Sequence, residues 1–169
     1  MKKLEQDIKS NAQELVKLAR AANITVSTAE SCTGGGIGAA ITAVSGASQV
    51  FQGGIIAYAN SVKIKNLYVS PRLIEQHGAV SKAVAIAMAE GANEALNTGI
   101  AVSVTGIAGP AGGTANKPVG TVWIGLAQKG QATQVNHFEF VDNARESIRT
   151  NTINEALKLL CAALQAKTG

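Results

Sequence analysis

The chain has 169 residues, of which 46% are hydrophobic and 15% charged, with a formal net charge of +4. This length and apolar content predict one domain over residues 1–169, with a core large enough to fold without disulfides. The lysines at the N-terminus are followed by acids rather than by an apolar run, so we expect no signal peptide, no membrane partner and a cytoplasmic location.

The positive charge lacks the pattern typical of nucleic-acid binding. Apart from Lys2-Lys3, no two basic residues are adjacent, and only 4% of residues are aromatic. Neither a basic stripe nor a stacking platform for bases is therefore predicted, and a small anionic ligand explains the excess equally well. The two cysteines, Cys32 and Cys161, are expected to be free thiols on separate elements.

The first segments of the chain alternate between helix and strand signals. Apolar residues recur at helical spacing near the N-terminus, at Leu4, Ile8, Leu15 and Leu18. The β-branched run 24–26 predicts a buried strand that ends near Thr28. The small apolar run 37–44 predicts a packed helix after a turn.

The middle of the chain continues this alternation. We expect a second strand over Gly54–Tyr58, followed by a short helix that Asn60 caps. Ser70-Pro71 begins another short helix, and Ser81 caps a longer, alanine-rich helix to Leu96.

The C-terminal part begins with a third buried strand over 100–104. A loop over 106–118 follows, with four glycines and two prolines, and long irregular loops in compact domains are usually functional. Residues 119–127 and 133–140 form a predicted hairpin, and a helix over 145–164 closes the chain.

Helices alternating with strands, ended by a hairpin, predict an α/β fold. We expect a three-layer α/β/α sandwich with a mixed, partly parallel sheet. Ligands of such sheets bind at the carboxyl ends of the strands. The turns over 30–36, 58–63 and 105–113 should therefore converge on one pocket.

The first of these turns contains Ser31, which we expect at the N-terminus of the following helix. Unpaired backbone N–H groups and the helix dipole would there favour an anion or an oxyanion. Glycines over 34–36 carry no side chain, so a ligand can approach the backbone closely.

Several familiar chemistries are disfavoured by the residues available. The chain has two histidines, His77 and His137, and neither adjoins one of the three turns, which argues against a Ser-His-Asp triad. No spacing offers three metal ligands, so we expect no metal. The run 34–39 fits a dinucleotide fingerprint, but no acidic residue follows until Glu75, which argues against an NAD cofactor. A P-loop lysine is also missing.

The remaining chemistry is a serine with a lysine and a tyrosine nearby. Lys63 with a lowered pKa could accept the Ser31 proton, Tyr58 could relay it, and N–H groups of Cys32 or Thr33 could hold an oxyanion. This arrangement favours acyl transfer or amide hydrolysis. Each residue also has a structural interpretation: Ser31 as a helix cap, Lys63 as a solvated side chain and Tyr58 as packing.

Five ordered motifs carry a resemblance to a known family. They are Thr28-Ala-Glu-Ser-Cys-Thr-Gly-Gly35, Tyr58-Ala-Asn-Ser-Val-Lys63, His77-Gly-Ala-Val-Ser81, Thr105-Gly-Ile-Ala-Gly-Pro110 with Gly112-Gly113, and Lys117-Pro-Val-Gly-Thr-Val122. Together they resemble the C-terminal domain of the competence-damage-inducible CinA family over nearly the whole chain. The family commonly has acidic residues where this chain has Ser61 and Ala111.

The resemblance implies an enzyme that deamidates nicotinamide mononucleotide to nicotinate mononucleotide and ammonia, without a cofactor, in the stand-alone form of the family. It implies Ser31, Tyr58 and Lys63 as the catalytic residues. Further residues are expected to bind the oxyanion or the pyridine nucleotide substrate: Glu30, Cys32, Thr33, Gly34, Gly35, Thr105, Gly106, Gly109, Gly112, Gly113 and Arg145. Arg149 and Lys117 are further candidates for the phosphate.

Several alternatives remain open at this stage. Cys32 is a rival nucleophile, although a buried small residue is the simpler interpretation. Glu30 either orients Lys63 or satisfies N–H groups of its own turn. The chain as a whole could be a nucleotide-binding module without activity, or a competence factor associated with DNA damage. Assembly into a homo-oligomer is compatible with the sequence.

Overall fold

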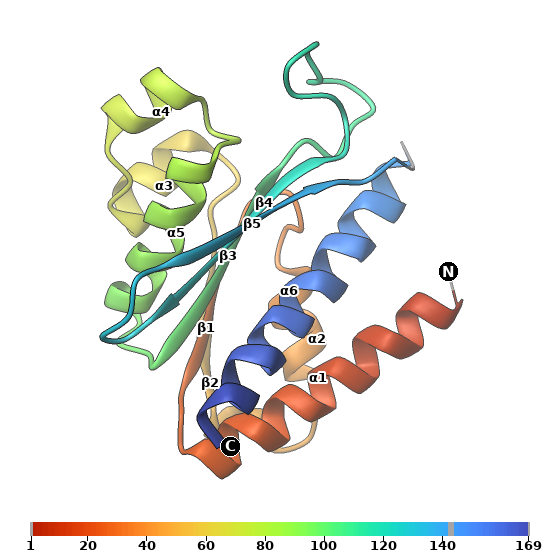
Figure 1. The fold of residues 1–169 in the computed structure, drawn as a ribbon, viewed down its shortest axis with the longest axis vertical. Helices are drawn as coiled ribbons and strands as arrows, with labels where there is room; N and C mark the ends of the chain where they lie inside the picture. Colours follow the sequence, from red (N-terminus) through yellow and green to blue (C-terminus); the bar gives the residue numbers. More distant parts are fainter. Residues whose placement is uncertain (1, 142–143, 169) are drawn as a thin grey trace.

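The computed structural model describes residues 2–141 and 144–168, with side chains up to 166. Its helices are α1 (Lys2–Ala22), α2 (Gly36–Thr42), α3 (Asn60–Leu67), α4 (Pro71–His77), α5 (Lys82–Ala95) and α6 (Arg145–Thr168), with a short 3₁₀ turn, η1 (Ala47–Gln49). The strands are β1 (Val26–Glu30), β2 (Phe51–Ile56), β3 (Ile100–Gly106), β4 (Thr121–Gln128) and β5 (Gln134–Glu139). Figure 1 shows their arrangement.

All five strands belong to one sheet with the order β2-β1-β3-β4-β5. β1 pairs in parallel with both β2 and β3, whereas β4 and β5 add antiparallel. The sheet is therefore mixed, as the sequence predicts. The chain moves from β1 outward to β2 and then returns to β3 on the other side of β1, which places a topological switch point between β1 and β3.

Helices cover both faces of the sheet. α3, α4 and α5 lie on one side, and α1, α2 and α6 lie on the other (Figure 1). Each face has its own apolar core: the larger is formed under α1, α2 and α6, and the smaller under α3 and α5. The three-layer α/β/α architecture is confirmed.

The α5 face owes its close packing to two glycines. A Cβ on Gly91 of α5 would overlap the Leu67 carbonyl oxygen, and one on Gly125 of β4 would lie 2.5 Å from the Ala85 carbonyl oxygen. Because any larger side chain would overlap backbone there, α5 sits directly against α3 and the sheet.

The bounds of β2 and the role of Asn60 differ from the sequence prediction. β2 covers Phe51–Ile56 rather than Gly54–Tyr58, because parallel pairing with β1 begins at Phe51 and the chain leaves the sheet after Ile56. Asn60 is the first residue of α3 rather than its cap, and its predecessor Ala59 occupies the cap position with extended backbone. In contrast, Ser81 caps α5 as predicted, since its hydroxyl accepts from the Val84 N–H.

The prediction that Ser31 lies at a helix N-terminus is wrong. α2 begins at Gly36, and a turn over 31–35 separates it from β1. Gly34 and Gly35 have left-handed backbone, with φ of 62° and 95°, which favours glycine at both positions. The glycines thus fold the turn, and Ser31 lies at the end of the strand.

Among the helices of the described residues, none is long and apolar enough to span a membrane.

Candidate active site

A cavity of about 210 Å³ opens at the switch point of the sheet. The three turns singled out in the sequence all contribute to it, together with the α4–α5 connection and the start of α6. Its walls are Ser31, Cys32, Tyr58, Asn60, Lys63, Ala79, Val80, Thr105, Gly106, Ala108 and Arg145. The convergence of the turns is therefore confirmed, while the roles of the individual residues stay predictions.

Ser31 and Lys63 meet at the base of this cavity. The Ser31 N–H donates to the Val104 carbonyl, 3.0 Å away, which fixes the end of β1 against β3. Lys63 reaches from α3, and its Nζ lies 3.1 Å from the Ser31 Oγ. Both side chains are buried, with 8% of Ser31 and 1% of Lys63 exposed. The solvated interpretation of Lys63 is thereby excluded.

The Lys63 amine has three neighbours. Besides Ser31, its Nζ donates to the carbonyls of Ala57 at 2.8 Å and Tyr58 at 3.2 Å. A neutral amine has two N–H groups and one lone pair. When the two N–H groups donate to the two carbonyls, the lone pair can face the serine hydroxyl. The geometry thus suits an un-ionised lysine that accepts a proton from Ser31.

Burial also favours the un-ionised form of Lys63. Removal of the ammonium from water lowers the pKa of Lys63 below 10.5, and the charge of a Cys32 thiolate would act weakly in the opposite direction. No carboxylate among the described residues pairs with this lysine. A lysine poised in this way resembles the general bases that activate serine nucleophiles.

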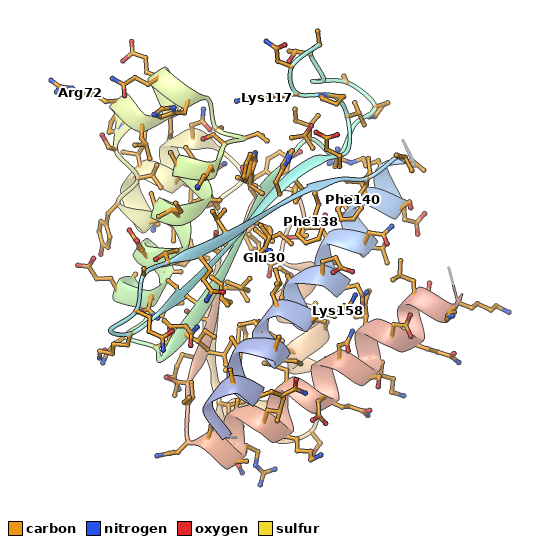
Figure 2. The ribbon with its side chains drawn as sticks, in the orientation of Figure 1. Glu30, Arg72, Lys117, Phe138, Phe140 and Lys158 are labelled. Atoms are coloured by element: carbon orange, nitrogen blue, oxygen red, sulfur yellow. The ribbon has the colours of Figure 1, made fainter. Side chains whose placement is uncertain are left out.

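The side chain of Glu30, the last residue of β1, lies at the N-terminus of α2. Its buried carboxylate accepts from the N–H groups of Gly35, Ile37 and Gly38, at 3.1, 3.0 and 2.8 Å. The hydroxyls of Thr28 and Thr33 add two further hydrogen bonds. Figure 2 shows Glu30 in the interior of the molecule. These five bonds answer the question left by the sequence: Glu30 satisfies the N–H groups of its turn and does not contact Lys63.

This arrangement changes where an oxyanion can bind. The positive end of α2 already holds a carboxylate, and the Gly35 N–H is committed to it, so neither is free for a ligand. The N–H of Cys32 donates to no other described residue, and Cys32 lines the cavity. Of the amide groups predicted from the sequence, that of Cys32 is the best placed; Thr33 and Gly34 are not part of the cavity wall.

Arg149 of α6 supports the same turn from the other side. Its Nε donates to the Cys32 carbonyl at 3.2 Å and its Nη2 to the Thr33 carbonyl at 2.9 Å. Because its guanidinium is engaged with the backbone and does not line the cavity, the prediction that Arg149 contacts a phosphate is not supported by the geometry. It acts on the shape of the turn that carries Ser31.

Tyr58 and Arg145 stand at the rim. The Tyr58 side chain is 62% exposed, and its hydroxyl accepts from Arg145 Nη2 at 3.3 Å. Arg145 Nη1 donates to the Gly109 carbonyl at 2.7 Å. Thr105, in contrast, is buried and donates to the Ala79 carbonyl at 2.8 Å, so it ties β3 to the α4–α5 connection.

The glycines of the β3–β4 loop have different positions. Gly106 lines the cavity, but Gly109, Gly112 and Gly113 do not. A Cβ on Gly109 would lie 2.5 Å from Val119 and one on Gly113 2.9 Å from the Val119 N, so both are required by packing within the loop.

The sequence prediction missed one wall of the cavity, formed by Ala79 and Val80. Their small apolar side chains carry no chemical signal of their own. The only sign was the motif His77-Gly-Ala-Val-Ser81, whose chemistry the sequence did not explain.

No cluster of three His, Cys, Asp or Glu side chains that could hold a metal ion occurs within 2–141 and 144–166.

Cys32 is unsuited to be the nucleophile. Burial raises the pKa of its thiol to about 12, with the Glu30 charge acting in the same direction. The thiol therefore stays protonated at neutral pH. Burial likewise raises the pKa of the Cys161 thiol, to about 11. We therefore expect that iodoacetamide at pH 8 modifies neither cysteine in the folded protein. After unfolding in urea, it should modify both. Alkylation of native Cys32, detected by peptide mass spectrometry, would contradict this assignment.

The family model of the CinA C-terminal domain matches residues 8–164. The chain belongs to this family. A CinA-like protein of a Synechocystis strain is 49% identical over 163 residues, which cover 95% of this chain and 39% of that protein. A putative competence-damage inducible protein of Acetivibrio thermocellus is 47% identical over 138 residues, or 82% of this chain and 33% of that protein. The chain thus spans well under half the length of these curated relatives.

Solved structures show the same fold. The competence/damage inducible protein CihA from Agrobacterium tumefaciens superposes with a TM-score of 0.91 at 38% identity, covering 94% of this chain and 96% of that one. A competence-damaged protein (CinA) superfamily protein from Escherichia coli gives a TM-score of 0.88 at 32% identity, covering 93% and 91%. These names describe competence and damage, and none names a reaction.

Proposed function

We propose that this CinA-family domain is an amidohydrolase that converts nicotinamide mononucleotide to nicotinate mononucleotide and ammonia. The observation that carries the proposal is the buried contact of 3.1 Å between Lys63 Nζ and Ser31 Oγ. A serine hydroxyl needs a base to become a nucleophile, and a buried lysine with a lowered pKa is such a base. The choice of substrate rests on the family resemblance.

In the first step, Ser31 Oγ attacks the carboxamide carbon while Lys63 Nζ takes the hydroxyl proton. The carbonyl oxygen becomes an oxyanion, for which the Cys32 N–H is the available donor in the wall. The substrate's pyridinium ring carries a positive charge and withdraws electrons from the carboxamide, which makes this carbon more susceptible to attack.

In the second step, the proton on Lys63 passes to the departing nitrogen, and ammonia leaves as the C–N bond breaks. Tyr58, at the rim, accepts a hydrogen bond from Arg145, so its own O–H remains able to donate during this transfer. Water then attacks the Ser31 ester with Lys63 again as the base, and nicotinate mononucleotide is released.

The test is incubation with nicotinamide mononucleotide, with ammonia and nicotinate mononucleotide measured separately. We expect equal amounts of both products. When hydroxylamine replaces water in attacking the acyl-enzyme, the hydroxamate of the mononucleotide should form in place of nicotinate mononucleotide, while ammonia is still released. Ser31→Ala should be inactive, while Ser61→Ala, on the exposed face of α3, should keep wild-type rates. Turnover retained by Ser31→Ala, or lost by Cys32→Ala alone, would overturn the nucleophile assignment.

The same experiment separates this proposal from a binding module without activity. Such a module would be stabilised against heat by the nucleotide and release no ammonia. Stabilisation without products in the wild type would therefore reject the enzymatic proposal.

A further inference from the structure

The size of the cavity indicates that a nucleotide would extend beyond it. Its volume of about 210 Å³ is below the range of roughly 300–1,000 Å³ typical of pockets that enclose a drug-sized ligand. The reacting carboxamide must reach Ser31 at the base. The other end of the substrate, which carries the phosphate, would then lie at or outside the rim.

A lysine lies beside the α4–α5 connection, which forms one wall of the cavity. Lys117 belongs to the β3–β4 loop, and its Nζ donates to the His77 carbonyl at the end of α4, 2.7 Å away. The ammonium also lies over Gly78, where a Cβ would be 3.2 Å from Nζ. Ala79 and Val80, the next residues along the chain, form the cavity wall. Figure 2 shows Lys117 extending from the loop toward α4.

The charge of Lys117 is not balanced by a partner in the described part of the chain. It forms no ion pair with a described carboxylate, and its Nζ donates to a neutral carbonyl. Among the described residues, Arg145, which lines the cavity, likewise donates to a carbonyl and a phenol oxygen. A hydrogen bond from an ammonium to a phosphate is stronger than one to a carbonyl, so an anion at the rim would compete well for Lys117.

The loop can release Lys117 without losing its position. Arg145 holds the base of the loop through Gly109, and Thr114 and Lys117 exchange backbone hydrogen bonds within the loop. The lysine side chain has a flexible four-carbon stem, so its Nζ can change partners while the backbone stays in place.

We propose that Lys117 is the specificity-determining residue for the phosphate: its ammonium exchanges the His77 carbonyl for phosphate oxygens when a nucleotide binds. The inference rests on the proposed function in that it concerns the same cavity. Lys117 would thereby let the site distinguish nicotinamide mononucleotide from nicotinamide riboside, which lacks the phosphate. Without substrate, the Lys117 ammonium stays on the His77 carbonyl.

The experiment compares both compounds in wild type, Lys117→Met and a matched control. Lys129→Met is that control, because Lys129 is an exposed lysine that, like Lys117, donates to a neutral acceptor, here the Asn97 side chain, and it lies in the β4–β5 hairpin. The ratio of kcat/KM for the mononucleotide to that for the riboside should fall about tenfold in Lys117→Met, mainly through KM, and stay unchanged in Lys129→Met. Equal losses on both compounds would overturn the inference and assign Lys117 a structural role.

Binding measurements separate this inference from the proposed function. In the Ser31→Ala background, calorimetry should show tighter binding of the mononucleotide than of the riboside, and Lys117→Met should remove most of the difference. If the wild type releases no ammonia but this difference is found, the proposed function fails and the inference stands. If ammonia is released and Lys117→Met leaves the selectivity ratio unchanged, the inference fails and the function stands. Absence of binding by either compound rejects both.

Discussion

Lys63→Met is expected to lower kcat for nicotinamide mononucleotide by on the order of 10³-fold. Methionine has a similar length and fills the buried space, but it cannot accept the Ser31 proton. Lys63→Arg should be equally impaired, because a guanidinium keeps its proton at neutral pH. The measurement is steady-state ammonia release with the protein concentration corrected for folded fraction.

The matched control is Lys65→Met, since Lys65 lies on the same helix and is exposed. It should change kcat by less than twofold. A Lys63→Met variant that keeps more than a tenth of wild-type kcat would show that Lys63 is not the base.

The pH dependence of the wild type provides a second readout. Burial lowers the pKa of Lys63 below 10.5, and only the neutral amine can take the serine proton. The value of kcat/KM should therefore rise with pH and level off above this lowered pKa, as measured in a pH–rate profile. A profile that falls across the same range would contradict the assignment.

The free energy of unfolding should also depend on the protonation of Lys63. The folded state binds the Lys63 proton less tightly than the unfolded state does, so the unfolded chain carries more protons between the lowered pKa and 10.5. The free energy of unfolding of wild type relative to Lys63→Met is thus expected to rise with pH across that window. Denaturant titrations at several pH values measure this difference.

The fold could be predicted largely from local patterns. Local sequence alone identifies buried strands rich in β-branched residues, such as Ile100–Gly106, and the helix cap at Ser81. Periodicity and capping chemistry depend only on residues that are close together in the chain. The start of β2 was missed because Phe51-Gln52-Gly53-Gly54 has weak strand propensity, and pairing with β1 decides it.

The site was predictable in its components but not in its geometry. The residue types at Ser31 and Lys63 suggested a chemistry, yet the burial of Lys63 beside Ser31 depends on the packing of two segments far apart in the sequence, which no local pattern encodes. The position of Ser31 was misjudged for a related reason. A serine followed by glycines is typical of a helix start, and only the structure places the Glu30 carboxylate at the N-terminus of α2.

Glu30 is the second residue whose replacement should have a large effect. Its carboxylate accepts five hydrogen bonds in the turn that carries Ser31, and it is 1% exposed. Removal of a buried acceptor leaves its donors without partners, and each such donor costs about 1–3 kcal/mol unless it finds another acceptor. The N–H groups of Ile37 and Gly38 also lose the anion that balances the end of the α2 dipole.

Glu30→Ala is therefore expected to lower the free energy of unfolding by about 4 kcal/mol. Glu30→Gln, which keeps one carbonyl oxygen but turns an NH₂ group toward the other donors, should lose a smaller part. Urea unfolding followed by circular dichroism measures both. The matched control is Glu90→Ala, because Glu90 accepts from the Thr133 hydroxyl on the surface. A surface contact of this kind is expected to contribute less than about 1 kcal/mol.

The consequence for activity follows from the position of the turn. Glu30 holds the backbone immediately after Ser31 in one conformation, and Arg149 holds the same segment through the Cys32 and Thr33 carbonyls. Loosening either support would misplace the serine oxygen relative to Lys63, and small misplacements of reacting groups are costly. In the folded fraction of the Glu30→Gln variant, kcat should fall at least tenfold while KM changes little. A higher KM with unchanged kcat would instead mean that Glu30 shapes the substrate pocket rather than positions the nucleophile.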